Sequence, residues 1–284
     1  MGTANASRRP FHQRLLSHFL TIVVAYLLVL ALVRVFESRL IFFPNYPGRL
    51  DGDWHPRDLN VEDVWITTSD GVRLHAWWIP GDKATFTFLA FHGNASNMAN
   101  RAPTYEFLRG TPANVFALEY RGYGHSEGSP SETGVYLDAE AAYEYLVNTK
   151  RADPKTIISF GQSLGGAVAT HLAARRRVAG VVLEGSFPSA SRVAREFFWF
   201  LPGVSLLVHG QLSTQVWLRE VHAPVLIVHC SQDPVIPFQF GQEVYDAALP
   251  PKNFLQINGD CHEESSQIGP TQYRTALQEF LNSL

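Results

Sequence analysis

The first strong feature of the sequence is an apolar run without charged residues over residues 15–33. At about 1.5 Å per residue, a helix of these positions is roughly 28 Å long, close to the hydrocarbon thickness of a bilayer, about 30 Å. A cleaved signal peptide is the alternative interpretation. The apolar part of a signal peptide is shorter than this run, however, and no small-residue cleavage site follows the run. We therefore predict an N-terminal tail at 1–14 and a transmembrane anchor at 15–33.

Arginines flank the anchor on both sides, which gives a weak signal for its orientation. Arg8, Arg9 and Arg14 precede the apolar run, whereas Arg34 and Arg39 follow it. Positive charge is enriched on the cytoplasmic side of membrane helices. The small excess before the helix predicts a single-pass protein with a cytoplasmic N-terminus and a domain on the outer, periplasmic or lumenal side.

The pattern changes after the anchor. Two prolines and a glycine within residues 43–48 cannot continue a helix, so we expect a linker over 34–49 and a folded domain over 50–284. Two runs, at 61–67 and 72–79, flank an Asp-Gly turn and predict an antiparallel hairpin at a sheet edge.

Short apolar runs and longer helical patterns then alternate to the end of the chain. Alternation of this kind is typical of an α/β fold with a mostly parallel sheet and helices on both faces. The expected strands cover 85–91, 114–120, 156–160, 178–183, 224–229 and 253–257, and the expected helices cover 97–109, 132–148, 164–176, 238–248 and 271–284.

The alternation breaks down between residues 186 and 219, where aromatic residues are crowded before Pro202 and Gly203. The segment follows an expected strand, and ligands of open parallel sheets bind at the carboxyl ends of strands. We interpret it as a short helical cap over a substrate pocket, although a helix packed on the core is the alternative. The predicted pocket residues are Phe187, Phe197, Phe198 and Trp199.

Composition narrows the class of protein. Of 284 residues, 46% are apolar and 17% charged, which excludes intrinsic disorder, and a net charge of −3 argues against nucleic-acid binding. Two cysteines cannot form a disulfide scaffold or a four-cysteine zinc site. We expect no metal and no cofactor, and the oligomeric state stays open.

The clearest chemical motif is Gly161-Gln162-Ser163-Leu164-Gly165, between an expected strand and an expected helix. In a Gly-x-Ser-x-Gly motif the two glycines allow a sharp turn that exposes the serine hydroxyl at the helix N-terminus. This context predicts that Ser163 is a nucleophile rather than an ordinary helix-capping serine.

A nucleophilic serine needs a histidine base and a carboxylate that orients it, in the chain order serine, acid, histidine for this turn. Asp233 follows the strand at 224–229, and His262 follows the strand at 253–257. The loops after parallel strands emerge at one sheet edge, so we predict Ser163, Asp233 and His262 as the catalytic residues. Glu184 and Asp260 are the alternatives to Asp233 as the acid. We expect Glu184 to bind the backbone of a loop rather than to orient the histidine.

Two backbone N–H groups are expected to bind the oxyanion of an acyl-transfer intermediate. Leu164 follows the nucleophile, and Asn94 lies in the turn His92-Gly93-Asn94 after the strand at 85–91. We predict the N–H groups of Asn94 and Leu164 as the oxyanion hole. A plain helix cap at Asn94 or Ser96 is the alternative, and both roles are compatible. His92 is expected to orient the loop rather than act as a base.

Four sequence stretches together resemble the α/β-hydrolase superfamily. They are Phe91-His92-Gly93-Asn94, residues 119–128 (EYRGYGHSEG), residues 161–166 (GQSLGG) and the loops of Asp233 and His262. Within this superfamily the chain is similar to a membrane-anchored, single-helix branch of lysophospholipase-like or serine aminopeptidase-like hydrolases. The resemblance covers residue 40 to the end. It implies an eight-stranded, mostly parallel sheet and a serine hydrolase of acyl esters or thioesters without a cofactor.

Three functions are compatible with these observations. The leading one is a membrane-tethered serine hydrolase whose acyl-enzyme forms from a small-molecule or lipid ester or thioester. The first alternative is a serine aminopeptidase, which needs an acidic pocket, but Glu196 and Glu220 are well separated in the insert. The second is a non-catalytic membrane scaffold, which has no physical need for the three catalytic residues.

The two cysteines flank the predicted acid and base. Cys230 ends the strand before Asp233, and Cys261 directly precedes His262, so their loops are expected to meet. The sequence cannot fix the directions of their Cβ atoms. Two buried free thiols are therefore the favoured interpretation, and a disulfide is the alternative.

Overall fold

The computed structural model of the chain describes residues 11–203, 208 and 212–284. The strands are β1 (Glu62–Thr67), β2 (Arg73–Ile79), β3 (Phe86–Phe91), β4 (Ala113–Leu118), β5 (Ile157–Gln162), β6 (Gly180–Glu184), β7 (Val225–Cys230) and β8 (Lys252–Ile257). The helices are α1 (Phe11–Val35), α2 (Glu37–Ile41), α3 (Ala102–Arg109), α4 (Glu132–Asn148), α5 (Leu164–Arg175), α6 (Ala190–Phe197), α8 (Thr214–Leu218), α9 (Phe238–Ala247), α10 (Ser265–Ile268) and α11 (Pro270–Asn282), with 3₁₀ turns η1 (Met98–Arg101) and η2 (Pro154–Thr156).

The eight strands form one sheet in the order β1-β2-β4-β3-β5-β6-β7-β8. β1 and β2 pair antiparallel, as the Asp-Gly turn predicts, and β2 pairs antiparallel with β4. Every other neighbouring pair is parallel. The predicted fold, an eight-stranded and mostly parallel sheet with helices on both faces, is therefore confirmed.

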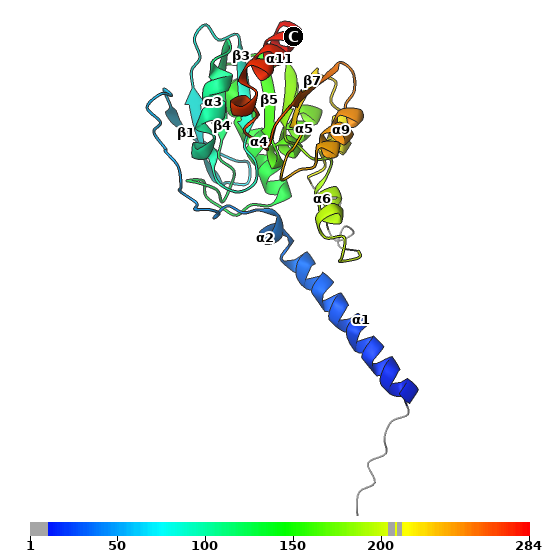
Figure 1. Ribbon diagram of the computed structural model, residues 1–284. Helices are drawn as coiled ribbons and strands as arrows, with labels where there is room; N and C mark the ends of the chain where they lie inside the picture. Colours follow the sequence, from blue (N-terminus) through cyan, green and yellow to red (C-terminus); the bar gives the residue numbers. More distant parts are fainter. Residues whose placement is uncertain (1–10, 204–207, 209–211) are drawn as a thin grey trace, which may run out of the picture.

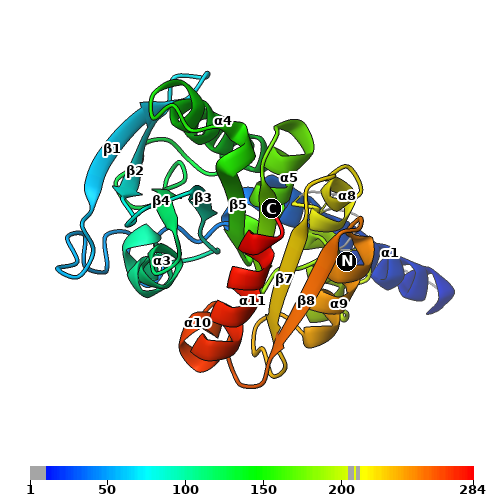
Figure 2. The ribbon, with the colours of Figure 1, turned by 90° about the horizontal axis from the view of Figure 1, so that it is seen from above.

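Helices cover both faces of the sheet, and alternate strand residues face each layer (Figure 2). In β3, Leu89 and Phe91 belong to the apolar cluster that includes residues of α4, α5 and α9, whereas Phe88 and Ala90 belong to the cluster that includes residues of α3 and α11. Strands buried on both faces read as continuous apolar runs, which is why the sequence pattern located them.

The N-terminal helix stands apart from this body. α1 leaves the domain at α2 and projects away from it (Figure 1), and none of its residues is buried. Its length and composition suit a membrane span, as they also suit a signal sequence. The predicted tail at 1–14 becomes helical from Phe11 onward, and residues 1–10 lie outside the described part.

The segment 34–49 is more ordered than the predicted linker. It contains α2, and the side chains of Glu37 and Phe42 are buried. Arg34 forms an ion pair with Glu37 at 2.6 Å, which joins the end of α1 to α2. Pro44 and Pro47 follow the end of α2 and do not continue it, as the sequence predicts. The burial of Glu37 and Phe42 depends on distant residues, which a local sequence pattern cannot reveal.

The predicted cap insert at 186–219 contains α6 and α8. Ser189 caps α6 by accepting a hydrogen bond from the N–H of Arg192. Residues 204–207 and 209–211 of the insert lie outside the described residues. α6 lies on the side of the domain from which α1 departs (Figure 1).

Candidate active site

Ser163 occupies a sharp turn between β5 and α5. Its backbone has φ 49° and ψ −114°, a conformation that non-glycine residues rarely adopt. A side chain on Gly161 would collide with the carbonyl of Gly165, and a side chain on Gly165 would collide with the carbonyl of Phe91. The two glycines of the motif therefore permit the close crossing of strand and helix that holds Ser163.

Asp233 and His262 meet at the carboxyl ends of β7 and β8. The Nδ1 atom of His262 lies 2.8 Å from Oδ2 of Asp233, and the Asp233 side chain is fully buried. Its other oxygen, Oδ1, accepts hydrogen bonds from the N–H groups of Val235 and Ile236, both at 2.8 Å. These contacts fix the carboxylate so that it orients the imidazole. Glu184, the alternative acid, does not make this contact.

His229, in β7, contacts the loop that carries Asp233. Its Nε2 lies 3.0 Å from the carbonyl oxygen of Ile236 and 3.4 Å from Oδ2 of Asp233. Burial lowers the pKa of His229 despite these acceptors, so the ring stays neutral at neutral pH. His229 thus acts as a buried structural histidine.

The turn after β6 lies next to both Ser163 and His262. The N–H of Ser163 donates to the carbonyl of Glu184 at 2.8 Å, and Ser186 Oγ donates to the carbonyl of Ser163 at 3.4 Å. Gly185 lies between Glu184 and Ser186, and a Cβ atom added to it would lie 3.0 Å from Nδ1 of His262. The backbone of residues 184–186 therefore holds the serine turn and the imidazole close to one another.

The protonation of His262 follows from its surroundings. Burial lowers the pKa of His262, but the hydrogen bond to Asp233 and the nearby carboxylates Glu263 and Glu264 outweigh burial, so the net shift is upward. A histidine with a raised pKa is a stronger base once it is neutral.

The side chain of Asn94 connects three segments. Its Oδ1 accepts hydrogen bonds from the Tyr123 hydroxyl at 2.9 Å and from the Phe43 N–H at 3.0 Å, and its Nδ2 donates to the carbonyl of Ile41. Ala95, next in the chain, has φ 61°. The side chain thus shapes the turn after β3, while the assignment of the Asn94 and Leu164 N–H groups to an oxyanion hole stays a prediction.

A buried polar network that the sequence did not predict holds the His262 loop. Gln162 Nε2 donates to the carbonyl of Glu263 at 3.0 Å and lies 3.2 Å from Oε2 of Glu184. The other oxygen of Glu184 accepts from the Ser265 N–H at 2.9 Å, and burial raises the pKa of Glu184 to about 7. Glu184 therefore holds loop backbone, as expected of it.

Glu263 joins the histidine loop to the turn after β3. Its carboxylate pairs with Arg101 at the end of η1, and it fills the space where a side chain on Gly93 would lie. Neither contact has a local sequence signal, because the partners are more than 160 residues apart. The position of Glu263 directly after His262 is the only hint.

His92 and Glu119 form a second buried pair beneath this turn. His92 Nε2 lies 3.0 Å from Glu119 Oε1, and Nδ1 lies 2.8 Å from the carbonyl of Gly93. Glu119 Oε2 accepts from the Met98 N–H at 3.1 Å. This arrangement orients the loop and matches the role expected of His92.

Cys230 and Cys261 form a disulfide, so the favoured interpretation of two free thiols is wrong. Their Cα atoms are 5.6 Å apart. β7 and β8 are neighbours, with Cys230 opposite Ile257, which brings the two loops together. The bridge ties the loop of Asp233 to that of His262.

The four predicted pocket residues occupy two environments. Phe187 is buried directly after the 184–186 turn, whereas Phe197, Phe198 and Trp199 are exposed by 46%, 48% and 79%. The latter three belong to an aromatic turn, defined here as residues 197–203. Their contact with a substrate stays a prediction.

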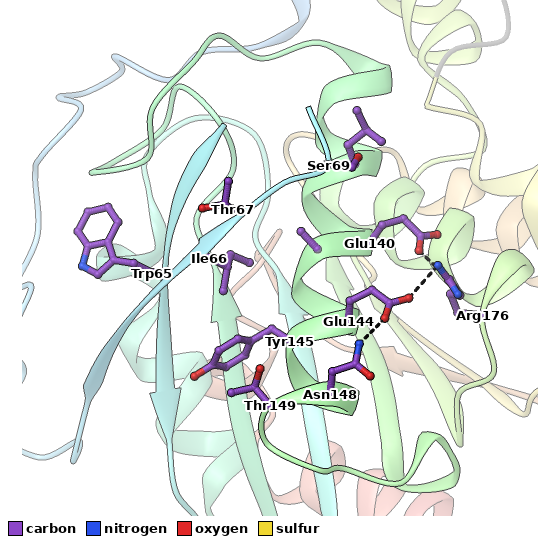
Figure 3. A pocket seen from close by; sticks show the side chains of 12 residues that line it. Trp65, Ile66, Thr67, Ser69, Glu140, Glu144, Tyr145, Asn148, Thr149 and Arg176 are labelled. Atoms are coloured by element: carbon purple, nitrogen blue, oxygen red, sulfur yellow. Dashed lines mark hydrogen bonds and ion pairs between the residues drawn. The ribbon is translucent and has the colours of Figure 1, made fainter. Parts of the chain in front are cut away.

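A surface hollow of about 660 Å³ lies between β1 and α4 (Figure 3). It is lined by residues such as Trp65, Tyr145 and Arg176, with Arg176 paired to Glu140 and Glu144. None of the predicted catalytic residues lines it. Within the described ranges, no three His, Cys, Asp or Glu side chains are grouped to hold a metal ion.

Comparisons with known proteins agree with this architecture. A family model described as the alpha/beta hydrolase fold matches residues 87–208. Protein Rv2307c of Mycobacterium tuberculosis is 34% identical over 248 residues, covering 86% of this chain and 87% of that protein. The alpha/beta hydrolase domain-containing protein WAV2 of Arabidopsis thaliana is 33% identical over 276 residues, covering 88% and 89%.

A solved structure of low sequence identity shares the fold. The esterase Pf2001 of Pyrococcus furiosus superposes with a TM-score of 0.69 at 23% identity, over 86% of this chain and 98% of that chain.

Proposed function

Because the chain belongs to the α/β-hydrolase family, we propose that it is a membrane-anchored serine hydrolase that cleaves carboxylic ester or thioester bonds. The observation that carries this proposal is the Asp233–His262 pair at 2.8 Å beside the strained turn of Ser163. The polar network around these loops fixes their positions before any substrate arrives.

The reaction proceeds through an acyl-enzyme. The Ser163 hydroxyl attacks the acyl carbon, while His262 takes the serine proton and Asp233 stabilises the resulting imidazolium. The N–H groups of Asn94 and Leu164 stabilise the oxyanion. The oxyanion then collapses: the bond from the acyl carbon to the leaving oxygen or sulfur breaks, His262 gives its proton to the departing alcohol or thiol, and the acyl group stays on the Ser163 oxygen. A water molecule, activated by His262, hydrolyses the acyl-enzyme.

Membrane attachment is assigned to α1. Its apolar side chains are exposed, with Leu16, Phe19 and Leu28 each at least 60% accessible, so nothing in the described chain covers them. A bilayer supplies the missing apolar surroundings. The Cys230–Cys261 disulfide supports an oxidising compartment for the domain, and hence the outward orientation that the arginines favour.

Esters or thioesters suit this site better than the amino terminus of a peptide. An aminopeptidase needs a carboxylate for the substrate ammonium group. The buried carboxylates of the site already have partners: Glu119 contacts His92, Glu184 accepts from Ser265, and Glu263 pairs with Arg101. A scaffold without activity would not need the orientation of His262 by a buried carboxylate.

A comparison of substrates tests this proposal. The purified full-length chain in detergent is offered a p-nitrophenyl ester, an acyl thioester and an aminoacyl p-nitroanilide of similar size. We expect hydrolysis of the ester or thioester, with kcat/KM well above that for the anilide. Preference for the anilide would support the aminopeptidase, and no hydrolysis of any of the three would contradict an enzyme of this class.

A further inference from the structure

The anchor leaves the domain at the edge of the sheet that carries the candidate active site. The side chain of Asn94, after β3, binds the backbone of Ile41, the last residue of α2, and of Phe43, just after α2. Arg49 Nε donates to the carbonyl of Gly124, in the loop after β4, at 2.8 Å. The segment after α1 therefore crosses the carboxyl ends of β3 and β4, the edge at which Ser163 and His262 also lie.

The aromatic turn extends from the same edge toward α1. It begins at Phe197, the last residue of α6, and α6 begins six residues after Glu184, whose carbonyl accepts a hydrogen bond from the Ser163 N–H. The hydroxyl of Tyr26, in the middle of α1, donates a hydrogen bond to the carbonyl of Pro202. Figure 1 shows α6 and this turn beside the domain-proximal half of α1.

The position of Tyr26 gives the depth of the turn. Tyr26 lies seven residues before Val33, the end of the uncharged run, or roughly 10 Å along the helix axis. Side chains that enter the boundary of a bilayer from its surface reach about 5–10 Å. If α1 spans a membrane, the contact with Pro202 places the aromatic turn at this depth in the same membrane.

The composition of the turn suits this environment. Residues 197–203 read Phe-Phe-Trp-Phe-Leu-Pro-Gly and include no charge, and Trp199 and Phe200 are 79% and 63% exposed. Tryptophan is typical of membrane–water interfaces. Charged residues lie on the domain side of the turn: Arg195 and Glu196 are exposed directly before it, Arg34 lies at the domain end of α1, and Arg39 lies in α2. This is the arrangement of an apolar wedge beside a charged rim.

We propose that the aromatic turn inserts into the bilayer that α1 spans, so that the active site takes acyl chains directly from the membrane. The bilayer is the occupant of the exposed aromatic surface because α1 belongs to the same chain and, through the contact of Tyr26 with Pro202, holds the turn at membrane depth. This inference rests on the proposed function and adds to it a substrate class, an ester or thioester with a membrane-embedded acyl chain.

Depth-dependent fluorescence quenching tests the insertion. The full-length chain is reconstituted in phosphatidylcholine vesicles with and without lipids brominated on the acyl chains. The emission lost in Trp199→Phe relative to the unsubstituted protein isolates Trp199, and Trp65→Phe isolates Trp65, an exposed tryptophan on β1 (43%). We expect brominated lipids to quench the Trp199 component and not the Trp65 component. An unquenched Trp199 component would overturn the insertion, whatever the enzymatic activity.

Activity measurements test the delivery of substrate. Phe200→Asp places a charge in the turn, and Trp65→Asp is the matched control at an exposed aromatic position beside Arg73. The substrates are soluble p-nitrophenyl butyrate and p-nitrophenyl palmitate dissolved in phosphatidylcholine vesicles. We expect Phe200→Asp to lower palmitate hydrolysis by about tenfold, as a loss of membrane insertion requires, with a much smaller change for butyrate.

The outcomes separate the two proposals. Equal losses on both substrates, or no loss on palmitate, would overturn delivery from the bilayer while leaving the hydrolase intact. If the unsubstituted protein hydrolyses neither substrate, the proposed function fails, and the quenching result still decides the insertion. If Phe200→Asp instead converts a dimer in detergent into a monomer, without quenching of Trp199, a second copy of this chain is the occupant.

Discussion

The loops around Ser163 and the aromatic turn lie on the same side of the sheet, yet their surroundings are opposite in kind. Around Ser163 the charged and polar side chains are buried, and Asp233, Glu184 and Glu263 each have a partner in the protein. In the aromatic turn the side chains are apolar and exposed, as in Trp199 and Phe200. Buried polar groups are stable only with such partners, whereas exposed apolar groups in a cluster call for an environment outside the chain.

The difference separates the groups that the fold itself stabilises from those for which we propose stabilisation by a membrane. The fold orients His262 and strains the Ser163 turn without external help. Burial of the exposed aromatic side chains of the turn becomes favourable only when an apolar environment outside the chain covers them. Substitutions near Ser163 should therefore affect catalysis in any solvent, while those in the turn should depend on the lipid.

The largest effect is expected at Ser163. Ser163→Ala removes the nucleophile, and ester hydrolysis should fall by about 10⁴-fold or more. The thermal transition, measured by circular dichroism, should stay close to that of the unsubstituted protein, because the hydroxyl contributes little to packing. Near-normal activity in Ser163→Ala would contradict the assignment.

The orientation of the base provides the next largest effect. Asp233→Asn should reduce kcat by roughly 10³–10⁴-fold, because the imidazole loses the carboxylate that fixes its tautomer and stabilises its charge. Glu184→Gln is the matched control, since it changes a buried carboxylate that holds loop backbone. A larger loss of kcat in Glu184→Gln than in Asp233→Asn would move the acid role to Glu184.

The pH dependence follows from the raised pKa of His262. Only the neutral imidazole accepts the serine proton, so a raised pKa moves the acidic limb of the profile to higher pH. We expect kcat/KM to fall as the pH is lowered, with a midpoint above pH 6.5. At pH 5 it should be roughly 30-fold or more below the value on the plateau at higher pH. A midpoint below 6.5, measured with an ester that does not ionise, would contradict the effect of Asp233.

The disulfide contributes to stability at the same site. Replacing both Cys230 and Cys261 with alanine removes a cross-link between positions 31 residues apart, and should lower the free energy of unfolding by about 2–4 kcal/mol. Activity should fall as well, since the bridge ties the acid loop to the base loop. Denaturant unfolding of the unsubstituted protein with and without a reductant provides the comparison, and equal stabilities would show that the bridge has no role.

The smallest effect is expected in the aromatic turn. Phe200→Ser should change the free energy of unfolding of the detergent-solubilised protein by less than about 0.5 kcal/mol, because an exposed side chain loses few contacts. A loss of several kcal/mol would show that Phe200 is packed against the protein, and would remove the contrast with the Ser163 region.

The sequence predicted the elements because their signals are local. The buried strands read as apolar runs, the Asp-Gly turn marked the hairpin of β1 and β2, and the glycines around Ser163 marked the turn before α5. The order of the chain then placed Asp233 and His262 on neighbouring loops. These inferences need only the period of the pattern and the geometry of a parallel sheet.

The remaining features depend on contacts between distant parts of the chain. The side chain of Asn94 binds the segment after α2, some 50 residues away, and Glu263 pairs with Arg101 across more than 160 residues. The bridge of Cys230 and Cys261 depended on Cβ directions that no pattern encodes. The exposure of the aromatic turn could not be predicted, because an apolar run reads the same in the sequence whether or not other parts of the protein cover it.

The most direct test of the central claim is covalent labelling of the nucleophile. The full-length protein is treated with a fluorophosphonate, and the labelled peptide is identified by mass spectrometry, with Ser163→Ala as the control. We predict a single adduct on Ser163 and loss of ester hydrolysis in proportion to labelling. An adduct on another serine that accounts for the lost activity, or full activity without an adduct on Ser163, would contradict the account.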